Sequence, residues 1–205
     1  MRALLIVDVQ NDFLPGGALE VKDGDKIIPV INKLQEKFDF ILATQDWHPA
    51  DHKSFAANHA GRKPGEVIKL GGTDQMLWPV HCVQESEGAQ FAQDLNRDKW
   101  NKVFKKGLNP MVDSYSGFFD NKKKEDTGLT AYLHEHDISD VYVAGLAADY
   151  CVKFTVLDAL KEGFDAYLIS DATRAVNLSP DDYDGSLKEM SKSGAEVISS
   201  AAVSF

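Results

Sequence analysis

Cys151 is the residue whose position in this sequence is best suited to covalent chemistry. It lies at the start of a predicted helix over residues 150–162, after the small residues of AGLAADYC, and Asp149 is placed to cap that helix. Unpaired N–H groups at a helix N-terminus favour a thiolate and can hold the oxyanion of a tetrahedral intermediate. The alternative is a buried thiol without a chemical role, because free cysteine is among the most often buried residues. Position alone leaves both interpretations open.

A cysteine nucleophile needs a base and a group that stabilises negative charge. Asp8 directly follows the apolar run at residues 3–7 and could accept the thiol proton. Lys105 and Lys106 follow a predicted strand at 102–104, and either could stabilise an anion. Ligands of parallel sheets bind beyond the carboxyl ends of the strands, so these groups and the cysteine should meet at one edge. The alternatives are a turn role for the aspartate and solvent exposure for either lysine.

Asp46, His48, His52 and His81 form a second group of residues that could do chemistry. Asp46 and His48 are two positions apart, so on an extended segment both side chains point to the same side. His81 and His52 lie in the same irregular stretch of the chain. One carboxylate and two imidazoles suit zinc, iron or manganese, with water or substrate in the open positions. The pattern therefore predicts one divalent metal ion.

Three aromatic residues, Phe13, Trp78 and Tyr115, lie beside these polar groups in the sequence. Large aromatic side chains can stack on a flat ring, and they also fill ordinary cores. Together with the polar groups they indicate a binding site for a small ring compound. Taken singly, each is as well explained by packing.

Strand-like and helix-like segments alternate along the chain. The apolar run ALLIV at residues 3–7 is typical of a strand covered on both faces of a parallel sheet. Apolar residues recur at helical spacing over residues 24–37, after Asp23 as a candidate cap. The other predicted strands are 40–44, 102–104, 141–146, 166–170 and one near Val197, and the other predicted helices are 126–136, 150–162 and about 180–192. The alternation predicts an α/β sandwich with a mainly parallel sheet.

Length and charge restrict the classes of protein. The 205 residues fit a single domain, 1–205, that includes a long irregular loop at about 46–100. With 22 basic and 32 acidic residues, the net charge of -10 argues against nucleic acid and anionic membranes as partners. The N-terminus lacks a signal-peptide core, so we expect a reducing, cytoplasmic setting in which Cys82 and Cys151 stay free.

The segments that carry these residues resemble the nicotinamidase/pyrazinamidase branch of the isochorismatase-like cysteine hydrolases. The resemblance extends from residue 3 to about 175, and its motifs are specific in combination. They are DVQNDFLPGG, TQDWHPADHKSF, WPVHCVQ, KKGLNPMVDSYSGFFD and GLAADYCVKFTVLDA. The family fold that it implies is a three-layer sandwich with a mainly parallel six-stranded sheet flanked by helices.

The resemblance also implies a role for each candidate residue. The catalytic aspartate, lysine and cysteine of the family match Asp8, Lys106 and Cys151, since the family lysine directly precedes a glycine. The oxyanion hole matches the backbone of Ala147 and Cys151, with a cis peptide bond after Leu146. The metal ligands match Asp46, His48 and His81, with His52 as a neighbour that approaches the metal in some members; the ring-contacting residues match Phe13, Trp78 and Tyr115.

The resemblance implies hydrolysis of nicotinamide to nicotinate and ammonia, and of pyrazinamide to pyrazinoate, in NAD salvage. The expected intermediate is a Cys151 thioester, and the expected cofactor is one divalent metal ion, zinc before iron or manganese, that orients the pyridine nitrogen. The expected partner is a small-molecule substrate, and the chain could form a homo-oligomer. Two alternatives stay open: an N-carbamoyl amidase or isochorismatase without this metal site, and a metal-binding or ligand-sensing protein without catalysis.

Overall fold

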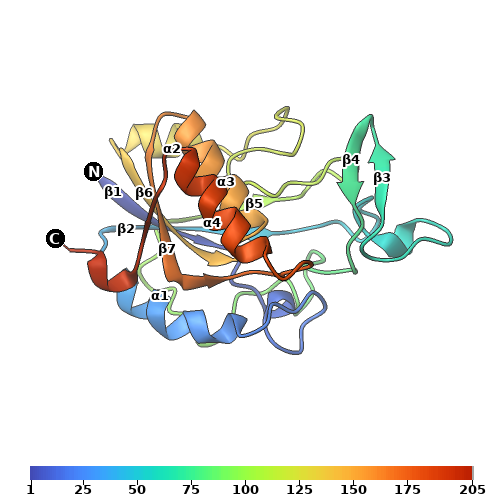
Figure 1. The fold of residues 1–205 in the computed structure, drawn as a ribbon, viewed down its shortest axis with the longest axis horizontal. Coiled ribbons are helices and arrows are strands. Elements are labelled where there is room, and N and C mark those ends of the chain that lie inside the picture. The colour runs from blue at the N-terminus through green and yellow to red at the C-terminus, as the bar shows by residue number, and fades with distance from the viewer. Residues whose placement is uncertain (205) are drawn as a thin grey trace.

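The computed structural model describes residues 1–204, which build a parallel sheet between two helical layers (Figure 1). The sheet has six strands in the order β5-β2-β1-β6-β7-β8, and every neighbouring pair is parallel. The strands are β1 (Arg2–Val7), β2 (Phe40–Asp46), β5 (Lys102–Lys106), β6 (Asp140–Leu146), β7 (Asp165–Arg174) and β8 (Glu196–Ile198). This confirms the α/β sandwich that the alternation of segments predicts.

The central strand β1 shows how the sequence fixes the layers. Successive side chains of a strand point to opposite faces, so a strand between two layers must be apolar throughout. Leu4 and Ile6 pack in the core on one face, and Leu5 and Val7 pack in the core on the other; all four side chains are fully buried. The apolar run at residues 3–7 therefore serves two hydrophobic cores.

Four α-helices cover the two faces. Helix α1 (Ile28–Gln35) belongs to the same core as Leu4, whereas α2 (Leu129–Glu135), α3 (Cys151–Lys161) and α4 (Asp182–Lys192) contribute to the core of Leu5. Short 3-10 turns are Asn11–Phe13, Gly24–Ile27, Ala56–Asn58 and Ser200–Ala202. Residues 24–27 form a 3-10 turn instead of the first turn of α1.

Asp23 does not cap the first helix as predicted. It has a left-handed backbone (φ 59°), its side chain makes no cap hydrogen bond, and its carboxylate pairs with Lys26 at 2.8 Å instead. The predicted ends of β2 and β5 were also wrong: each strand continues two residues further, to Asp46 and to Lys106. The polar residues expected just beyond these strands are thus their last residues.

The strand order reverses between β1 and β6. From β1 the chain moves to β2 and β5 on one side, and from β6 it moves to β7 and β8 on the other. In a parallel sheet such a reversal opens a crevice at the carboxyl ends of the two strands, where ligands bind. Asp8 follows β1 at this point, and the loop that leads to Cys151 follows β6.

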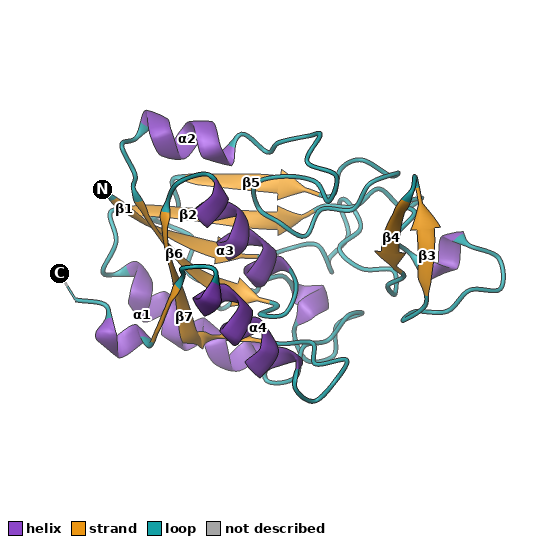
Figure 2. Ribbon diagram, turned by 45° about the horizontal axis from the view of Figure 1, so that its top comes forward, coloured by secondary structure: helices purple, strands orange, loops and turns teal. Residues whose placement is uncertain are grey.

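A two-stranded antiparallel ribbon, β3 (Val67–Leu70) and β4 (Thr73–Met76), lies apart from the sheet (Figures 1 and 2). The sequence predicts no regular element in this region, because each strand has only four residues and half of these residues are exposed. A short exposed ribbon carries no clear alternation of apolar and polar residues. The ribbon leads into the segment that holds Trp78 and His81.

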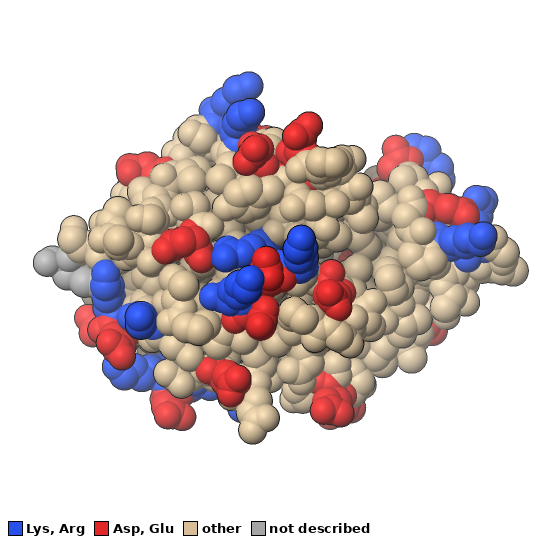
Figure 3. All heavy atoms as spheres, turned by 60° about the horizontal axis from the view of Figure 1, so that its bottom comes forward, with Lys and Arg blue, Asp and Glu red and all other residues tan. Residues whose placement is uncertain are grey.

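Figure 3 shows how charged side chains are distributed on one face of the molecule. On the face drawn in Figure 3, acidic and basic side chains are interspersed and form no broad basic area. Among the described residues, no helix has the length and apolar character needed to cross a membrane.

Candidate active site

Lys106 is the centre of a buried cluster of charged groups. Its ammonium group donates hydrogen bonds to Asp46 Oδ1 (2.9 Å), to the Ser114 carbonyl oxygen (2.9 Å) and to Cys151 Sγ (3.4 Å). Its Nζ also lies 2.8 Å from Asp8 Oδ2. Burial alone would lower the pKa of Lys106, but the adjacent carboxylates raise it well above its usual value. The lysine is therefore a fixed positive charge between the nucleophile candidate and two carboxylates.

Asp8 is placed to act as a base. Its side chain is fully buried, and Oδ1 accepts a hydrogen bond from the Thr44 hydroxyl at 2.6 Å. Oδ2 lies 2.8 Å from the Lys106 ammonium nitrogen. Burial raises the pKa of Asp8, and the charge of Asp46 adds to this effect while Lys106 opposes it. A carboxylate with a raised pKa that shares the Lys106 ammonium group with a thiol is suited to take a proton from that thiol.

Cys151 lies at the first position of α3 and is 8% exposed. Burial raises its pKa well above the usual thiol value; Lys106 opposes this, while Asp8 and Asp46 add to it. The resting side chain is therefore a neutral thiol and not the thiolate that a helix N-terminus alone would favour. Deprotonation requires a base, which makes the adjacent Asp8 necessary for nucleophilic attack.

Asp149 does not cap α3, contrary to the prediction. Its two carboxylate oxygens accept hydrogen bonds from the backbone N–H groups of Val176 and Asn177, both at 2.9 Å. The side chain thus fixes the segment after β7 beside the start of α3. The position of Asp149 just before a predicted helix suggests a cap, and the sequence gives no sign of its partners 27 and 28 residues away.

The loop before α3 provides backbone donors beside the thiol. The Leu146–Ala147 peptide bond is cis, as the family resemblance implies. Cys151, as the first residue of its helix, has an N–H group without an intrahelical acceptor. Among the described residues, no backbone acceptor pairs with the N–H of Ala147 or Cys151. Both N–H groups are thus available for an oxyanion.

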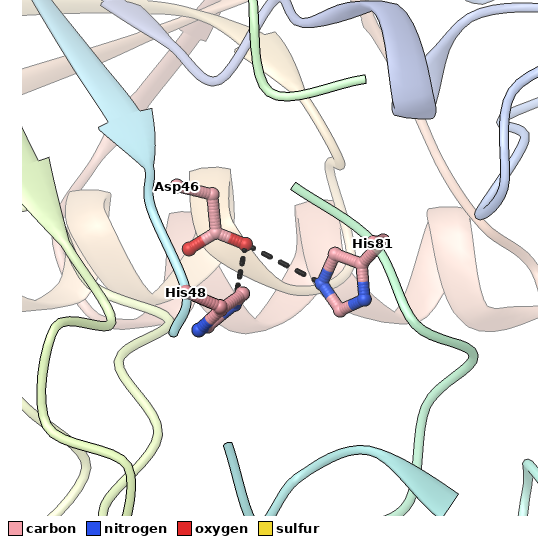
Figure 4. A group of neighbouring side chains, drawn as sticks. All are labelled: Asp46, His48 and His81. Carbon is pink, nitrogen blue, oxygen red and sulfur yellow. Dashed lines mark hydrogen bonds and ion pairs between the residues drawn. The ribbon is translucent and has the colours of Figure 1, made fainter. Parts of the chain in front are cut away.

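Asp46, His48 and His81 converge as the sequence predicts (Figure 4). His48 Nε2 lies 2.9 Å and His81 Nε2 lies 3.4 Å from the same carboxylate oxygen, Asp46 Oδ2. Asp46 ends β2, and His48 follows on the extended chain. Burial alone would raise the pKa of Asp46, but the positive charges of His48 and Lys106 hold it well below its usual value.

Hydrogen bonds to backbone carbonyls orient both imidazole rings. His48 Nδ1 donates to the Gly107 carbonyl oxygen at 3.0 Å, and His81 Nδ1 donates to the Pro79 carbonyl oxygen at 2.8 Å. The Nε2 atoms of both rings therefore face the same carboxylate oxygen, an arrangement that a shared cation would stabilise. A metal-bound histidine usually has its other ring nitrogen held in this way. These residues therefore fit a divalent metal ion.

His52 lies beside this group but outside it. Its ring centroid is 4.3 Å from that of His48, and its Nδ1 lies 2.7 Å from the Ser54 hydroxyl. Its Nε2 is buried without a hydrogen-bond partner among the described residues. Burial and the charge of His48 lower the pKa of His52 to about 4, so the ring is neutral. His52 groups with His48 and Asp113 instead of with Asp46 and His81.

The three predicted aromatic residues line one cavity with Cys151 and with two of the candidate metal ligands, Asp46 and His81. The aromatic wall includes Tyr150, which the sequence analysis missed; its ring is perpendicular to that of Trp78, with centroids 4.8 Å apart. The lining residues are Phe13, Leu19, Asp46, Trp78, His81, Asp113, Ser114, Tyr115, Ala147, Tyr150, Cys151 and Val176.

Two residues of the DVQNDF motif support the site without entering the cavity. The side chain of Gln10 accepts a hydrogen bond from the backbone N–H of Asp46 (2.7 Å) and donates to the carbonyl oxygens of Asp46 and Ala89 (both 2.8 Å). Asp12 accepts from the backbone N–H of Cys82 at 2.7 Å, next to His81. The motif marked these positions, but the residue types alone did not predict their partners.

Comparisons with known sequences and structures all indicate the same protein family. The model of the isochorismatase domain matches residues 2–202. The nicotinamidase of Escherichia coli (strain K12) is 50% identical, over 95% of this chain and 92% of that protein. A nicotinamidase/pyrazinamidase structure from Acinetobacter baumanii has a TM-score of 0.95 and 45% identity, and covers 98% of this chain and 96% of that chain. A pyrazinamidase of Pyrococcus horikoshii in complex with zinc has a TM-score of 0.78 and 40% identity, with 97% and 98% coverage.

The chain belongs to the isochorismatase domain family, as the site and the fold together lead one to expect. Within that family its similarity is to nicotinamidases along nearly the whole chain.

Proposed function

We propose that this chain hydrolyses nicotinamide to nicotinate and ammonia, and pyrazinamide to pyrazinoate, through a thioester on Cys151. The position of Lys106 carries the proposal. One ammonium group contacts the thiol sulfur, the candidate base Asp8 and the candidate metal ligand Asp46. A purely structural or ligand-binding site has no need to hold a base and a thiol around one buried cation. The similarity to nicotinamidases supports the substrate.

In the first half of the proposed reaction, Asp8 takes the thiol proton and Cys151 Sγ attacks the carboxamide carbon. The C=O electrons move to oxygen, and the N–H groups of Ala147 and Cys151 hold this oxyanion; each donor contributes about 3–4 kcal/mol to transition-state stabilisation. The C–N bond then breaks, and Asp8 returns the proton to the leaving nitrogen. Ammonia leaves, and the acyl group stays on sulfur.

In the second half, Asp8 takes a proton from a water molecule, whose oxygen attacks the thioester carbon. The C–S bond breaks, nicotinate forms, and the sulfur regains its proton. Lys106 stays protonated through both halves, because two carboxylates surround it. It keeps Asp8 ionised between proton transfers and stabilises negative charge on sulfur.

Asp46, His48 and His81 are the proposed ligands of one divalent metal ion, and His52 is a neighbour outside this set. Zinc is the proposed metal, supported by the zinc complex of the Pyrococcus horikoshii relative; iron and manganese accept the same ligands. The bound ion supplies a Lewis-acid site for the lone pair of the pyridine nitrogen. Phe13, Trp78 and Tyr115 enclose the ring, so that its carboxamide faces Cys151.

Residues 1–205 are proposed to act as one hydrolase domain, in which the loop at about 46–100 contributes to the metal site. A cytoplasmic setting is supported by two buried free cysteines, and NAD salvage by the family resemblance.

Ammonia release from matched amides tests this function. We expect rapid release from nicotinamide and pyrazinamide, and release slower by at least about tenfold from benzamide, which lacks the ring nitrogen; a tenfold difference corresponds to about 1.4 kcal/mol. Faster hydrolysis of an N-carbamoyl amino acid than of nicotinamide would contradict the proposal and favour the alternative of an N-carbamoyl amidase. Metal content of the purified protein, measured in the same preparations, separates a metal-free relative from a metal-bound one.

A further inference from the structure

We propose that Gln75 is a positioning residue that ties the β3–β4 ribbon to Asp113 and Tyr115 and thereby holds the aromatic wall of the cavity in place. The inference rests on the proposed function, because that wall is assigned to the ring of the substrate. It gives a role to a ribbon that lies apart from the sheet in Figures 1 and 2.

Gln75 is an unusual buried residue on this ribbon. Its neighbours in β4, Thr73 and Asp74, are exposed, whereas the Gln75 side chain is only 5% exposed. A strand of an isolated ribbon normally buries an apolar side chain, and a buried amide is stable only when its hydrogen bonds are made. A glutamine at this buried position therefore needs hydrogen-bond partners, which an apolar side chain would not need.

Two of the three partners of Gln75, Asp113 and Tyr115, lie on the segment after β5. Its Nε2 donates to Asp113 Oδ2 at 3.0 Å and to the backbone carbonyl of Met76 at 2.8 Å, and it lies 3.4 Å from the Tyr115 hydroxyl oxygen. The other carboxylate oxygen of Asp113 accepts from the backbone N–H of Ser114 at 2.8 Å. Asp113 is thus fixed on its own loop and offers the ribbon a charged acceptor.

These hydrogen bonds continue into the wall of the cavity. Trp78 Nε1 donates to the Tyr115 hydroxyl oxygen at 3.1 Å, and the two rings are nearly perpendicular. Asp113, Tyr115 and Trp78 all line the cavity that contains Cys151. Without the amide of Gln75, a buried carboxylate oxygen of Asp113 loses a donor, and β4, which leads into the segment that carries Trp78, loses its contact to the segment after β5. Both changes loosen the ring-binding wall and leave Asp8, Lys106 and Cys151 untouched.

The test compares Gln75→Leu with wild type and with Asp74→Leu, an exposed position on the opposite face of β4. For Gln75→Leu we expect KM for nicotinamide to rise about tenfold, the effect of about one charge-assisted hydrogen bond, while kcat changes by less than about twofold. Asp74→Leu should change neither constant. A role confined to stability predicts a lower Tm and an unchanged KM for the folded fraction, and this result would overturn the inference.

A charge-swapped pair keeps the inference testable if Gln75→Leu does not fold. Gln75→Glu places two carboxylates together and should raise KM; combining it with Asp113→Asn restores a donor and an acceptor, and should bring KM back toward wild type. A double variant no better than Gln75→Glu contradicts the inference. The Kd for nicotinate, measured by tryptophan fluorescence, should rank wild type, Gln75→Glu and the double variant in the same order without turnover. If wild type binds nicotinate but releases no ammonia from nicotinamide, the proposed function fails while the ranking still decides the role of Gln75.

Discussion

Asp8, Asp46 and Cys151 meet around Lys106 in the buried site. Lys106 lies close to all three of the others, and its charge lowers the pKa of both carboxylates. Residue types and strand ends predicted that a lysine would reach Asp8 and the thiol. They did not predict its hydrogen bond to Asp46, because that contact depends on the parallel register of β2 and β5, which pairs Asp46 with Lys106.

The first prediction concerns the pH dependence of kcat/KM. Turnover requires ionised Asp8, so kcat/KM rises with pH as this carboxyl loses its proton, and its raised pKa places the acid limb above the ordinary aspartate range. Because the charge of Lys106 lowers the pKa of Asp8, Lys106→Met should move the acid limb to higher pH and reduce kcat/KM at neutral pH roughly 10²–10³-fold.

Lys105→Met is the matched control for this experiment. Lys105 is exposed, and its Nζ lies 3.7 Å from the centroid of the Trp47 ring, away from Asp8. Its removal should leave the acid limb in place. An unshifted acid limb in Lys106→Met would show that the lysine does not set the protonation of Asp8.

The second prediction concerns Gly107. Its backbone is left-handed (φ 70°), and an added Cβ would lie 2.6 Å from His48 Nδ1, the atom that donates to the Gly107 carbonyl oxygen. Gly107→Ala should displace the His48 ring, lower metal content and destabilise the fold by at least about 1 kcal/mol. Gly61→Ala is the control, because Gly61 has a similar φ of 75° and no atom near its added Cβ. Equal metal content in the two variants would rule out a specific contact with His48.

At the scale of elements, the strands buried on both faces were predictable and the exposed pieces were not. β1 and β6 are continuous apolar runs, and their burial follows from that pattern. β2 and β5 end in polar residues whose burial depends on the neighbouring strand and the site, so their last two residues could not be assigned. The β3–β4 ribbon is short and half of its residues are exposed, and the partners of Asp149 lie 27 and 28 positions away in the sequence.

The third prediction tests how Gln10 joins elements beneath the site. Its side chain makes three hydrogen bonds to the backbones of Asp46 and Ala89. Gln10→Leu leaves buried backbone groups without partners and should lower the free energy of unfolding by about 1–3 kcal/mol. Urea denaturation measures this change, with Gln93→Leu as an exposed glutamine control. An unchanged midpoint for Gln10→Leu would mean that these contacts do not stabilise the folded state.

At the scale of the whole molecule, the site joins distant parts of the chain. The catalytic candidates follow β1, end β5 and begin α3, and the metal ligands come from the end of β2 and from the segment after the ribbon. A ligand that binds only the folded chain stabilises it, by about 2.7 kcal/mol when its concentration is 100 times its Kd. A bound metal ion should therefore contribute to global stability as well as to catalysis.

The fourth prediction follows from removing that metal. Chelation should lower Tm and raise KM for nicotinamide, while the rate at which a small alkylating reagent modifies Cys151 changes little. Added zinc should restore Tm and KM in wild type. In Asp46→Ala, added zinc should restore neither Tm nor KM, because one of the three proposed metal ligands is missing. If chelation changes the alkylation rate of Cys151 by as large a factor as it changes KM, the metal also controls the reactivity of the thiol, and the prediction is wrong.

The central claim is that Cys151 forms the acyl intermediate, and ammonia release by Cys151→Ala tests it most directly. The thiol lies against Lys106, at the first turn of α3 and in the same cavity as the aromatic wall. We predict that this variant releases no ammonia from nicotinamide above the buffer rate, while it keeps its metal and binds nicotinate within about threefold of the wild-type Kd, since the ring contacts are unchanged. Ammonia release at the wild-type rate from metal-loaded Cys151→Ala would contradict the account.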